Sequence, residues 1–424
     1  MKTKLLSVIF IFSTYLISAQ TWDSVGSGID GGINYGRIFA LCVYDSGVYA
    51  GGSFASAGGV SANSIAKWDG TNWSSLGTEA LIGTRALTVF DNTLYAGGSF
   101  MTTVSNGFAN HIAKWDGTNW LTSGSLPETV IAMGVYNNSI YSAEIVNSDD
   151  KYIYKLEGSS WSYNNSGTDN AVNAFAVYNN ELYAGGNFLT AGGDSVNRIT
   201  RWNGTNWSAT GAGLNQVVWC LSMHNGELYA GGNFSTRVSK WDGTNWTAIG
   251  NGFNADVRAL CSFNGVLYAG GNFTTAGGIS ANHIAQWDGT NWSALGDGID
   301  STVYALCAYN NELYAGGLFS HAGGIPASRI ARWNPLDIGV KENNFILKSS
   351  VQPNPFSSSS NLILNKEVKN GILLIYSIDG KEVRISNLNG KNLVIEKTNL
   401  NEGLYFYKIT SDNEVIATGK LIIQ

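Results

Sequence analysis

A short motif, L-Y-A-G-G-x-F, recurs through most of the chain and constrains the fold more than any other feature. Its seven versions share a tyrosine, at spacings of 39 to 46 residues: Tyr49, Tyr95, Tyr141, Tyr183, Tyr229, Tyr268 and Tyr314. Most versions are followed by a second motif close to I-A-x-W-D-G-T-N-W-S-x-L-G. A self-similar period of about 45 residues predicts a propeller or a stacked array of small units.

Each repeat resolves into four short strands. In the sixth repeat they are VRALCSF, VLYAGGNF, HIAQW and NWSALG, with turn dipeptides at Asn264–Gly265 and Asp288–Gly289. Asn-Gly and Asp-Gly accept the positive φ angles that tight hairpins need. Four antiparallel strands per repeat, with almost no helical periodicity, predict an all-β chain in which residues 20–335 form a seven-bladed β-propeller.

The two ends of the repeat region complement each other. The seventh repeat stops at RWNP, where Pro335 interrupts the pattern before a fourth strand. A near match to the missing strand stands at 21–29, where TWDSVGSGI resembles NWSALGDGI at 291–299. We therefore predict that the N-terminal strand completes the seventh blade and closes the ring, which hides a sheet edge.

The glycine pairs of the motif could suggest a phosphate-binding loop. No Gly-Lys-Ser/Thr follows them, however, and seven such loops would demand seven nucleotides. A glycine pair inside a strand is better explained by a bulge or a close backbone approach. The third repeat departs from the pattern, with SAEIV in place of A-G-G-x-F.

Residues 1–19 read as a signal peptide. Lys2 and Lys4 precede the apolar run LLSVIFIFSTYLI, and Ser18–Ala19 offers a cleavage point before Gln20. No later stretch is apolar enough to span a membrane, so we expect an exported mature chain without a transmembrane segment. The four cysteines are interpreted as small buried thiols, with a nucleophile or metal set as the alternative: Cys42, Cys220, Cys261 and Cys307.

The repeat ends near 335, and we predict a linker over 336–350 and a small β-sandwich over 351–424. The sandwich contains PNPF, IYSIDGKEV, LNEGLYFYKI and the terminal GKLIIQ. In order and spacing these segments resemble the type A C-terminal sorting domain of type IX secretion cargo; an ordinary immunoglobulin-like domain is the alternative. The resemblance implies recognition by the type IX machinery, removal of the domain, and release or surface attachment. It carries over to these motif residues, most of them interpreted as turn-forming: Pro353, Asn354, Pro355, Gly380, Gly403, Gly419 and Lys420.

The repeat region itself resembles secreted bacterial propellers related to kelch and galactose-oxidase central domains, and those of cortical cell-polarity marker proteins. This resemblance implies the fold and says little about activity, because propellers carry many unrelated functions.

Composition narrows the chemistry. Residues 20–335 hold 13 Lys/Arg and 22 Asp/Glu, a net charge of −9, so nucleic acid is not an expected partner. Each of the four histidines lies in a different repeat, and none forms an HxH or HExxH motif. We predict no metal site and no cofactor. The W-D-G-T-N-W turns resemble sialidase Asp-boxes but are one residue too short, which favours a turn role.

A site should lie where the repeats differ. The residue after the first Val, Ile or Thr of each innermost strand varies, and we expect it at one mouth of the central channel: Phe39, Arg85, Ile131, Asn173, Trp219, Arg258 and Tyr304. Of these, Phe39, Arg85, Trp219, Arg258 and Tyr304 are the candidate binding residues, because aromatics beside arginines suit sugars and protein partners. The alternative is that Trp219 only plugs the channel.

The sequence therefore predicts a secreted or cell-surface binding or adhesion protein, without catalysis, for a glycan or a protein. A secreted carbohydrate-active enzyme using the same mouth is the main alternative, and a structural surface-layer protein is the third.

Overall fold

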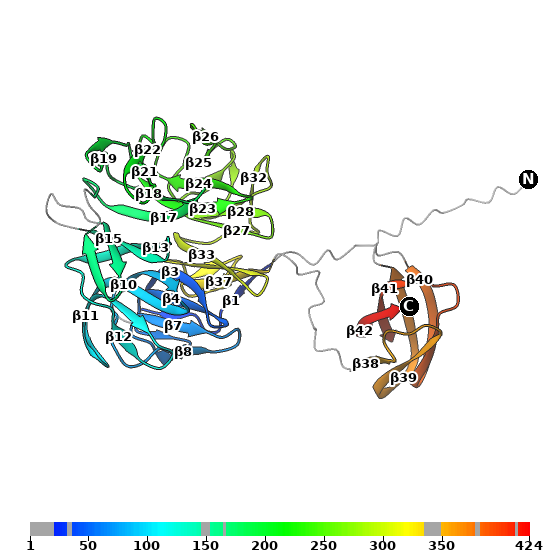
Figure 1. Cartoon of the computed structure of the whole chain (residues 1–424). Helices are drawn as coiled ribbons and strands as arrows, with labels where there is room; N and C mark the ends of the chain where they lie inside the picture. The colour runs from blue at the N-terminus through cyan, green and yellow to red at the C-terminus, as the bar shows by residue number, and fades with distance from the viewer. Residues whose placement is uncertain are drawn as a thin grey trace, which may run out of the picture. The chain divides into compact units, whose positions relative to one another are not determined.

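The computed structural model describes residues 21–31, 36–145, 153–163, 167–334, 349–377, 382–411 and 414–424, and the predicted signal peptide lies outside these ranges. All regular structure in them is β-strand (Figure 1). The contacts divide the chain between Asp337 and Ile338 into two compact units. None of the described segments forms a helix that could cross a membrane.

The larger unit contains seven four-stranded antiparallel sheets, one for each repeat, which we call blades one to seven. From the innermost strand outward, blade one has β3 (Arg37–Tyr44), β4 (Gly47–Ser53), β7 (Ile65–Trp68) and β8 (Trp73–Ser75); blade two has β9 (Thr84–Phe90), β10 (Thr93–Val104), β11 (Gly107–Trp115) and β12 (Trp120–Thr122); blade three has β13 (Thr129–Tyr136), β14 (Ser139–Ile145), β15 (Ile153–Glu157) and β16 (Ser160–Tyr163); and blade four has β17 (Val172–Tyr178), β18 (Glu181–Gly186), β21 (Ile199–Trp202) and β22 (Trp207–Ala209). Blade five has β23 (Val218–His224), β24 (Glu227–Gly232), β25 (Val238–Trp241) and β26 (Trp246–Ala248); blade six has β27 (Val257–Phe263), β28 (Val266–Gly271), β31 (Ile284–Trp287) and β32 (Trp292–Ala294); and blade seven has β33 (Val303–Tyr309), β34 (Glu312–Gly317), β37 (Ile330–Asn334) and β1 (Thr21–Ser24).

Short strands in the loops of several blades form one three-stranded sheet, β2-β5-β6, and three two-stranded sheets. The strands are β2 (Ile29–Asp30), β5 (Ser56–Ala57), β6 (Val60–Ser61), β19 (Thr190–Ala191), β20 (Asp194–Ser195), β29 (Thr275–Ala276), β30 (Ile279–Ser280), β35 (His321–Ala322) and β36 (Ile325–Pro326).

The innermost strands form a closed ring. Each contacts the next in the order β3, β9, β13, β17, β23, β27, β33, and β33 contacts β3 (Figure 1). The Tyr309 hydroxyl also donates to the backbone oxygen of Ser46 at 2.6 Å, which links the last blade to the first. The predicted propeller is confirmed.

The N-terminal strand closes the ring as predicted. Strand β1 pairs with β37 in antiparallel register, and Trp22 stands opposite Trp333. The two indoles lie 5.3 Å apart between ring centroids, and Trp22 Nε1 donates to the carbonyl of Leu295 in blade six. A strand from one end of the repeat region thus completes the blade at the other end.

The same tryptophan arrangement joins most blades to the preceding blade. The second indole of each pair packs on the first, and in most blades it donates across the blade boundary; Trp73 donates to Val25 O and Trp120 to Leu76 O, both at 2.9 Å. Trp207 of blade four packs on Trp202, but its Nε1 has no such partner among the described residues. Blade three has Leu156 in the first position and keeps the bond through Trp161 to Ser123 O. The repeated tryptophans are therefore structural.

The Asp-Gly turns are structural as well. The Asp288 carboxylate accepts hydrogen bonds from the backbone N–H groups of Thr290 and Asn291, both at 2.7 Å. These bonds lower the pKa of Asp288, and the same pattern holds at Asp69, Asp116 and Asp242. This supports the turn interpretation over an Asp-box.

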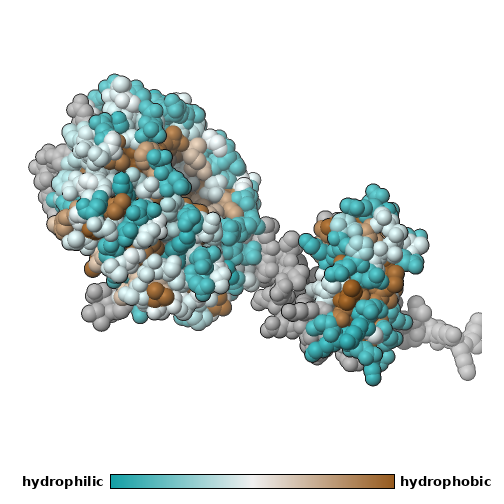
Figure 2. Space-filling model, turned by 60° about the horizontal axis from the view of Figure 1, so that its bottom comes forward, coloured by the Kyte–Doolittle hydropathy of each residue, from teal (hydrophilic) through white to brown (hydrophobic). Residues whose placement is uncertain are grey.

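The smaller unit is one continuous five-stranded antiparallel sheet folded around a single core. Its strands are β38 (Ser349–Gln352), β39 (Ser359–Ser377), β40 (Glu382–Glu396), β41 (Gly403–Ser411) and β42 (Glu414–Ile423). Register shifts within β39 let its first part pair with β38 and its last part with β41, while β40 pairs along both. Figure 2 shows apolar side chains on one face of this unit, and Ile385 and Val394 are each 58% exposed.

Candidate functional site

All seven predicted mouth residues occupy one kind of backbone irregularity. In blade one Ile38 pairs with Gly52 and Ala40 with Gly51, which leaves Phe39 as the extra residue of a β-bulge. The same shift occurs in the other blades at Arg85, Ile131, Asn173, Trp219, Arg258 and Tyr304. Bulges re-aim a side chain out of the ladder. The seven variable positions therefore lie at one end of the ring of innermost strands.

The glycine pair of the motif lies opposite the bulge and fits the close backbone there. A Cβ on Gly52 would lie 2.1 Å from the carbonyl oxygen of Arg37, so the backbone of blade one leaves no room for a side chain there. A Cβ on Gly51 would lie 2.6 Å from Cγ2 of Thr84 in the next blade. In blade one, one glycine thus fits beside the bulge and the other lets the next blade pack, which agrees with the close backbone approach expected from the sequence. Blade three keeps the same bulge with Ala143 and Glu144 at these two positions.

One group of mouth residues gathers around Phe39, and we call it the Phe39 cluster. The Tyr304 ring lies 5.9 Å from the Phe39 ring between centroids, at an interplanar angle of 48°. The guanidinium carbons of Arg85 and Arg37 lie 5.0 and 5.8 Å from the same Phe39 centroid. Blades seven, one and two therefore bring two aromatic rings and two positive charges together.

A second group, the Trp219 cluster, joins blades five and six. The Arg258 guanidinium lies 3.9 Å from the Trp219 ring centroid and forms a 3.0 Å ion pair with Asp256. Asp256 also pairs with Arg237 at 3.6 Å. Trp219 Nε1 is buried without a hydrogen-bond partner among the described residues. Arg258 therefore covers part of the Trp219 ring and holds its orientation.

The two remaining mouth residues lie outside these clusters. Asn173 Nδ2 donates to the carbonyl of Val218 at 2.9 Å and so connects blades four and five. Ile131 lies next to Val130, whose strand partner is Glu144.

Glu144 is a feature that sequence reasoning did not single out. It stands where the other blades have the second glycine, and it is 1% exposed. Neither carboxylate oxygen has a hydrogen-bond partner of good geometry in the described part of the chain. Burial raises the pKa of Glu144 to about 8; the backbone N–H of Glu128 opposes this shift and the Glu128 charge adds to it.

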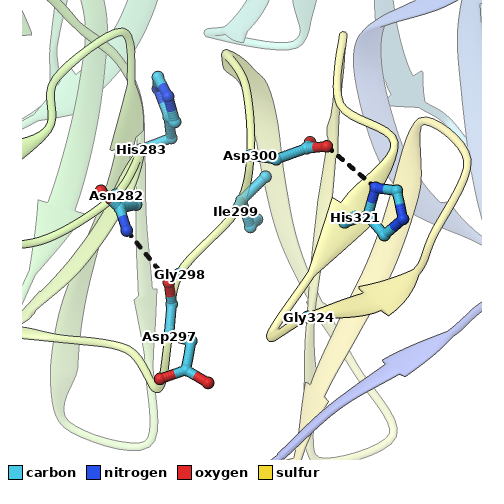
Figure 3. Close-up of a pocket in the computed structure, with 8 residues that line it drawn as sticks. All are labelled: Asn282, His283, Asp297, Gly298, Ile299, Asp300, His321 and Gly324. Carbon is cyan, nitrogen blue, oxygen red and sulfur yellow. Dashed lines mark hydrogen bonds and ion pairs between the residues drawn. The ribbon is translucent and has the colours of Figure 1, made fainter.

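A pocket of about 330 Å³ lies among the loops of blades six and seven (Figure 3). It is lined by Asn282, His283, Asp297, Gly298, Ile299, Asp300, His321 and Gly324. His321 Nδ1 pairs with Asp300 at 3.1 Å and also lies 2.9 Å from Ser320 Oγ. A Ser-His-Asp triad needs serine and aspartate on opposite ring nitrogens, so this trio is not one. Asp300 instead stabilises its loop by accepting a hydrogen bond from the backbone N–H of Ser320. Asp169 does the same in blade four, where it accepts from the backbone N–H of Leu189.

The histidines at the shared repeat position have a common structural use. His111 and His283 place Nδ1 3.2 and 3.1 Å from a carbonyl of their own blade, those of Gly98 and Gly271. Arg198 occupies the same position and donates to Asn187 O. No cluster of three or more His, Cys, Asp or Glu suited to a metal occurs among the residues that the structure describes.

The cysteines are free thiols in apolar surroundings. Burial raises the pKa of Cys42 to about 11 and those of Cys220 and Cys261 to about 12, and it raises the pKa of Cys307 as well. Such thiols are weak nucleophiles because the reactive thiolate is disfavoured. The geometry favours the packing interpretation over a reactive thiol.

In the smaller unit the motif residues connect an early loop to the last strand. Asn354 Nδ2 donates to Lys420 O at 3.0 Å, and Asn354 Oδ1 accepts from Ile422 N at 2.7 Å. Pro353 and Pro355 flank this asparagine. A Cβ on Gly419 would lie 2.4 Å from the Tyr407 hydroxyl. Gly403 has a φ of 149° at the start of β41, and Gly380 lies outside the described residues.

We expect Asn354→Ala to destabilise the smaller unit by about 1–2 kcal/mol, because two hydrogen bonds to β42 are lost at a partly exposed site. The measurement is the denaturant midpoint of that unit in the full chain. Asn361→Ala, at an exposed position on β39, is the matched control and should leave the midpoint unchanged. Equal effects of both substitutions would contradict the role given to Asn354.

Comparisons with known proteins agree with this architecture. The extracellular domain of BT3049 from B. thetaiotaomicron, assigned to a hybrid two-component system, aligns at 11% identity and a TM-score of 0.53, over 96% of this chain and 57% of its own. The extracellular domain of BT4673 from the same organism, assigned to a one-component system, aligns at 10% identity and a TM-score of 0.51, over 96% and 59%. This chain thus spans less than two thirds of either neighbour, and the likeness concerns the fold alone.

The sequence comparisons concern the smaller unit. No curated protein matches the chain. Residues 350–424 match the family model described as "Secretion system C-terminal sorting domain". The C-terminal unit is therefore a sorting domain of type IX secretion, and the protein is exported by that system to the cell surface.

Proposed function

We propose that the propeller is a non-catalytic binding module that the sorting domain delivers to the cell surface, and that its ligand, a glycan or a protein, binds at the channel mouth. The observation that carries this proposal is the contrast between blades. Positions shared by the blades serve turns, blade packing and interblade hydrogen bonds, whereas the bulge positions vary and hold the two aromatic–arginine clusters. Aromatic and arginine side chains supply much of the energy at binding surfaces.

The same proposal includes three further points: the repeat is kelch-like, residues 1–19 are a signal peptide, and the sorting domain contacts the type IX machinery. A carbohydrate-active enzyme would need a pair of catalytic groups at the mouth. The charged groups found in the two clusters are arginines and Asp256, and Asp256 is already paired with two arginines. This arrangement favours binding over catalysis.

The test is a binding screen of the mature chain against glycans and surface proteins, with product release measured in parallel. Trp219→Ala and Phe39→Ala are expected to weaken binding at least tenfold, because each removes the ring on which its cluster is built. Tyr163→Ala, at an exposed aromatic of the outermost strand β16, is the matched control and should bind as wild type. Thermal unfolding of each variant shows that it is folded. Released products would favour the enzyme, and unchanged binding in both mouth variants would place the site elsewhere.

A further inference from the structure

Two arginines of the propeller differ from the other six. Arg201, Arg237, Arg258 and Arg332 form ion pairs with carboxylates, and Arg198 and Arg329 donate to backbone carbonyls. Neither Arg37 nor Arg85 has an ion pair or a hydrogen bond from its guanidinium to any described residue. The region is otherwise acidic, with a net charge of −9 over residues 20–335.

These two arginines belong to one cluster. Arg37 begins β3 in blade one, Arg85 is the bulge residue of β9 in blade two, and both guanidinium groups lie within 6 Å of the Phe39 ring centroid. The pKa of Arg85 is lowered, first by burial and second by the positive charge of Arg37. The charge of Arg37 is therefore close enough to disfavour that of Arg85, and the Phe39 ring attracts both guanidinium groups.

Such a pair has a defined chemical complement. Guanidinium groups bind carboxylate and other oxyanions through parallel N–H···O bonds, and an anion between two of them relieves their repulsion. The Tyr304 ring beside Phe39 adds an apolar surface with a hydroxyl, a combination that suits the face of a sugar ring carrying an acidic group. A ligand with these features would meet both the charges and the rings.

We infer that Arg37 and Arg85 form an oxyanion clamp, and that the propeller binds an acidic saccharide whose anionic group lies between the two guanidinium groups. The inference deepens the proposed function and rests on it. Carboxylate and sulfate share the required chemistry, and the experiment separates them.

The experiment measures binding to the full mature chain by calorimetry with three oligosaccharides. They are an oligogalacturonate, which carries carboxylates; its fully methyl-esterified form, which is neutral and of similar shape; and a sulfated galactan oligosaccharide without carboxylates. We expect the carboxylated or the sulfated probe to bind at least tenfold more tightly than the neutral ester. Which of the two binds identifies the anion.

Variants connect this preference to the clamp. Arg37→Gln and Arg85→Gln should each weaken the preferred acidic probe about tenfold and leave the neutral ester unchanged, and the double variant should remove the preference. Arg201→Gln, which breaks an ion pair with Glu181 between the second and third strands of blade four, is the matched control and should behave as wild type.

Equal binding of acid and ester, or wild-type binding by the double variant, would overturn the clamp. If the wild-type chain binds a neutral glycan or a protein and loses it in Trp219→Ala, the proposed function stands while the clamp fails. If the wild-type chain binds none of the saccharides or proteins tested, both fail.

Discussion

Replacing Trp22 with alanine is expected to lower the free energy of unfolding of the propeller by about 3–5 kcal/mol, the usual cost of truncating a large buried aromatic. Trp22 is 4% exposed, packs on Trp333 and donates to Leu295 O. It anchors β1, a strand of four residues that is joined to its blade by pairing with β37 and not by a hairpin. Losing the anchor should open the ring at blade seven, and faster amide exchange along β37 would report that opening.

Two further variants separate closure from loss of packing. Trp22→Phe keeps a ring and removes the hydrogen bond, so its cost should be smaller by several kcal/mol than that of the alanine variant. Trp246→Ala removes the equivalent indole of blade five, whose four strands follow one another in the chain. It should destabilise the propeller without faster exchange in β37. Exchange in β37 that is the same in Trp22→Ala and Trp246→Ala would contradict the closing role of β1.

The repeat made the fold predictable because each copy supplies independent support for the same strands and turns. Asn264–Gly265 and Asp288–Gly289 mark hairpins whose φ angles the structure confirms, with Gly265 at 73° and Gly289 at 100°. The closing strand was predictable for a related reason: the missing fourth strand of the last repeat left a recognisable sequence at the other end of the region. Local chemistry and global topology agree at these places.

The candidate site was predictable only in part, because it depends on contacts between blades. Counting along the repeat located Phe39, Arg85 and Tyr304 at equivalent positions, and the structure adds that they meet around one ring. Arg37 lies two residues before a bulge position and was not singled out. No sequence pattern showed that its charge lacks a carboxylate partner among the described residues, because that depends on where the acidic residues of the neighbouring blades lie.

Glu144 could not have been recognised as buried from sequence, because a glutamate usually lies at the surface. Its burial follows from register: Glu144 pairs with Val130 at the place where the other blades have glycine. The departure SAEIV was visible in the sequence, and the structure shows its consequence, a carboxyl group with a pKa raised to about 8.

Glu144 is therefore expected to make the propeller less stable as the pH rises. Below the ordinary carboxyl pKa of 4.5, the folded and unfolded chains both hold the proton, and Glu144 contributes no pH dependence. Between pH 4.5 and about 8 the unfolded chain releases the proton while the folded chain keeps it, so the free energy of unfolding falls across this window and levels off above it. At about 1.4 kcal/mol for each pKa unit the loss could not exceed about 5 kcal/mol, and we expect about 1–3 kcal/mol after local relaxation.

Glu144→Gln tests this directly, because it keeps the shape of the side chain and removes the titration. Urea unfolding at pH 4.5, 6 and 8 should show wild type losing stability relative to Glu144→Gln as the pH rises, with the largest gap at pH 8. Glu128→Gln is the control: it removes the neighbouring charge that adds to the shift and leaves Glu144 in place, so most of the pH dependence should remain. If the free energy of unfolding changes with pH in the same way in wild type and Glu144→Gln, the carboxyl group reaches water in the folded chain. The glutamate of the third repeat would then cause no loss of stability at high pH.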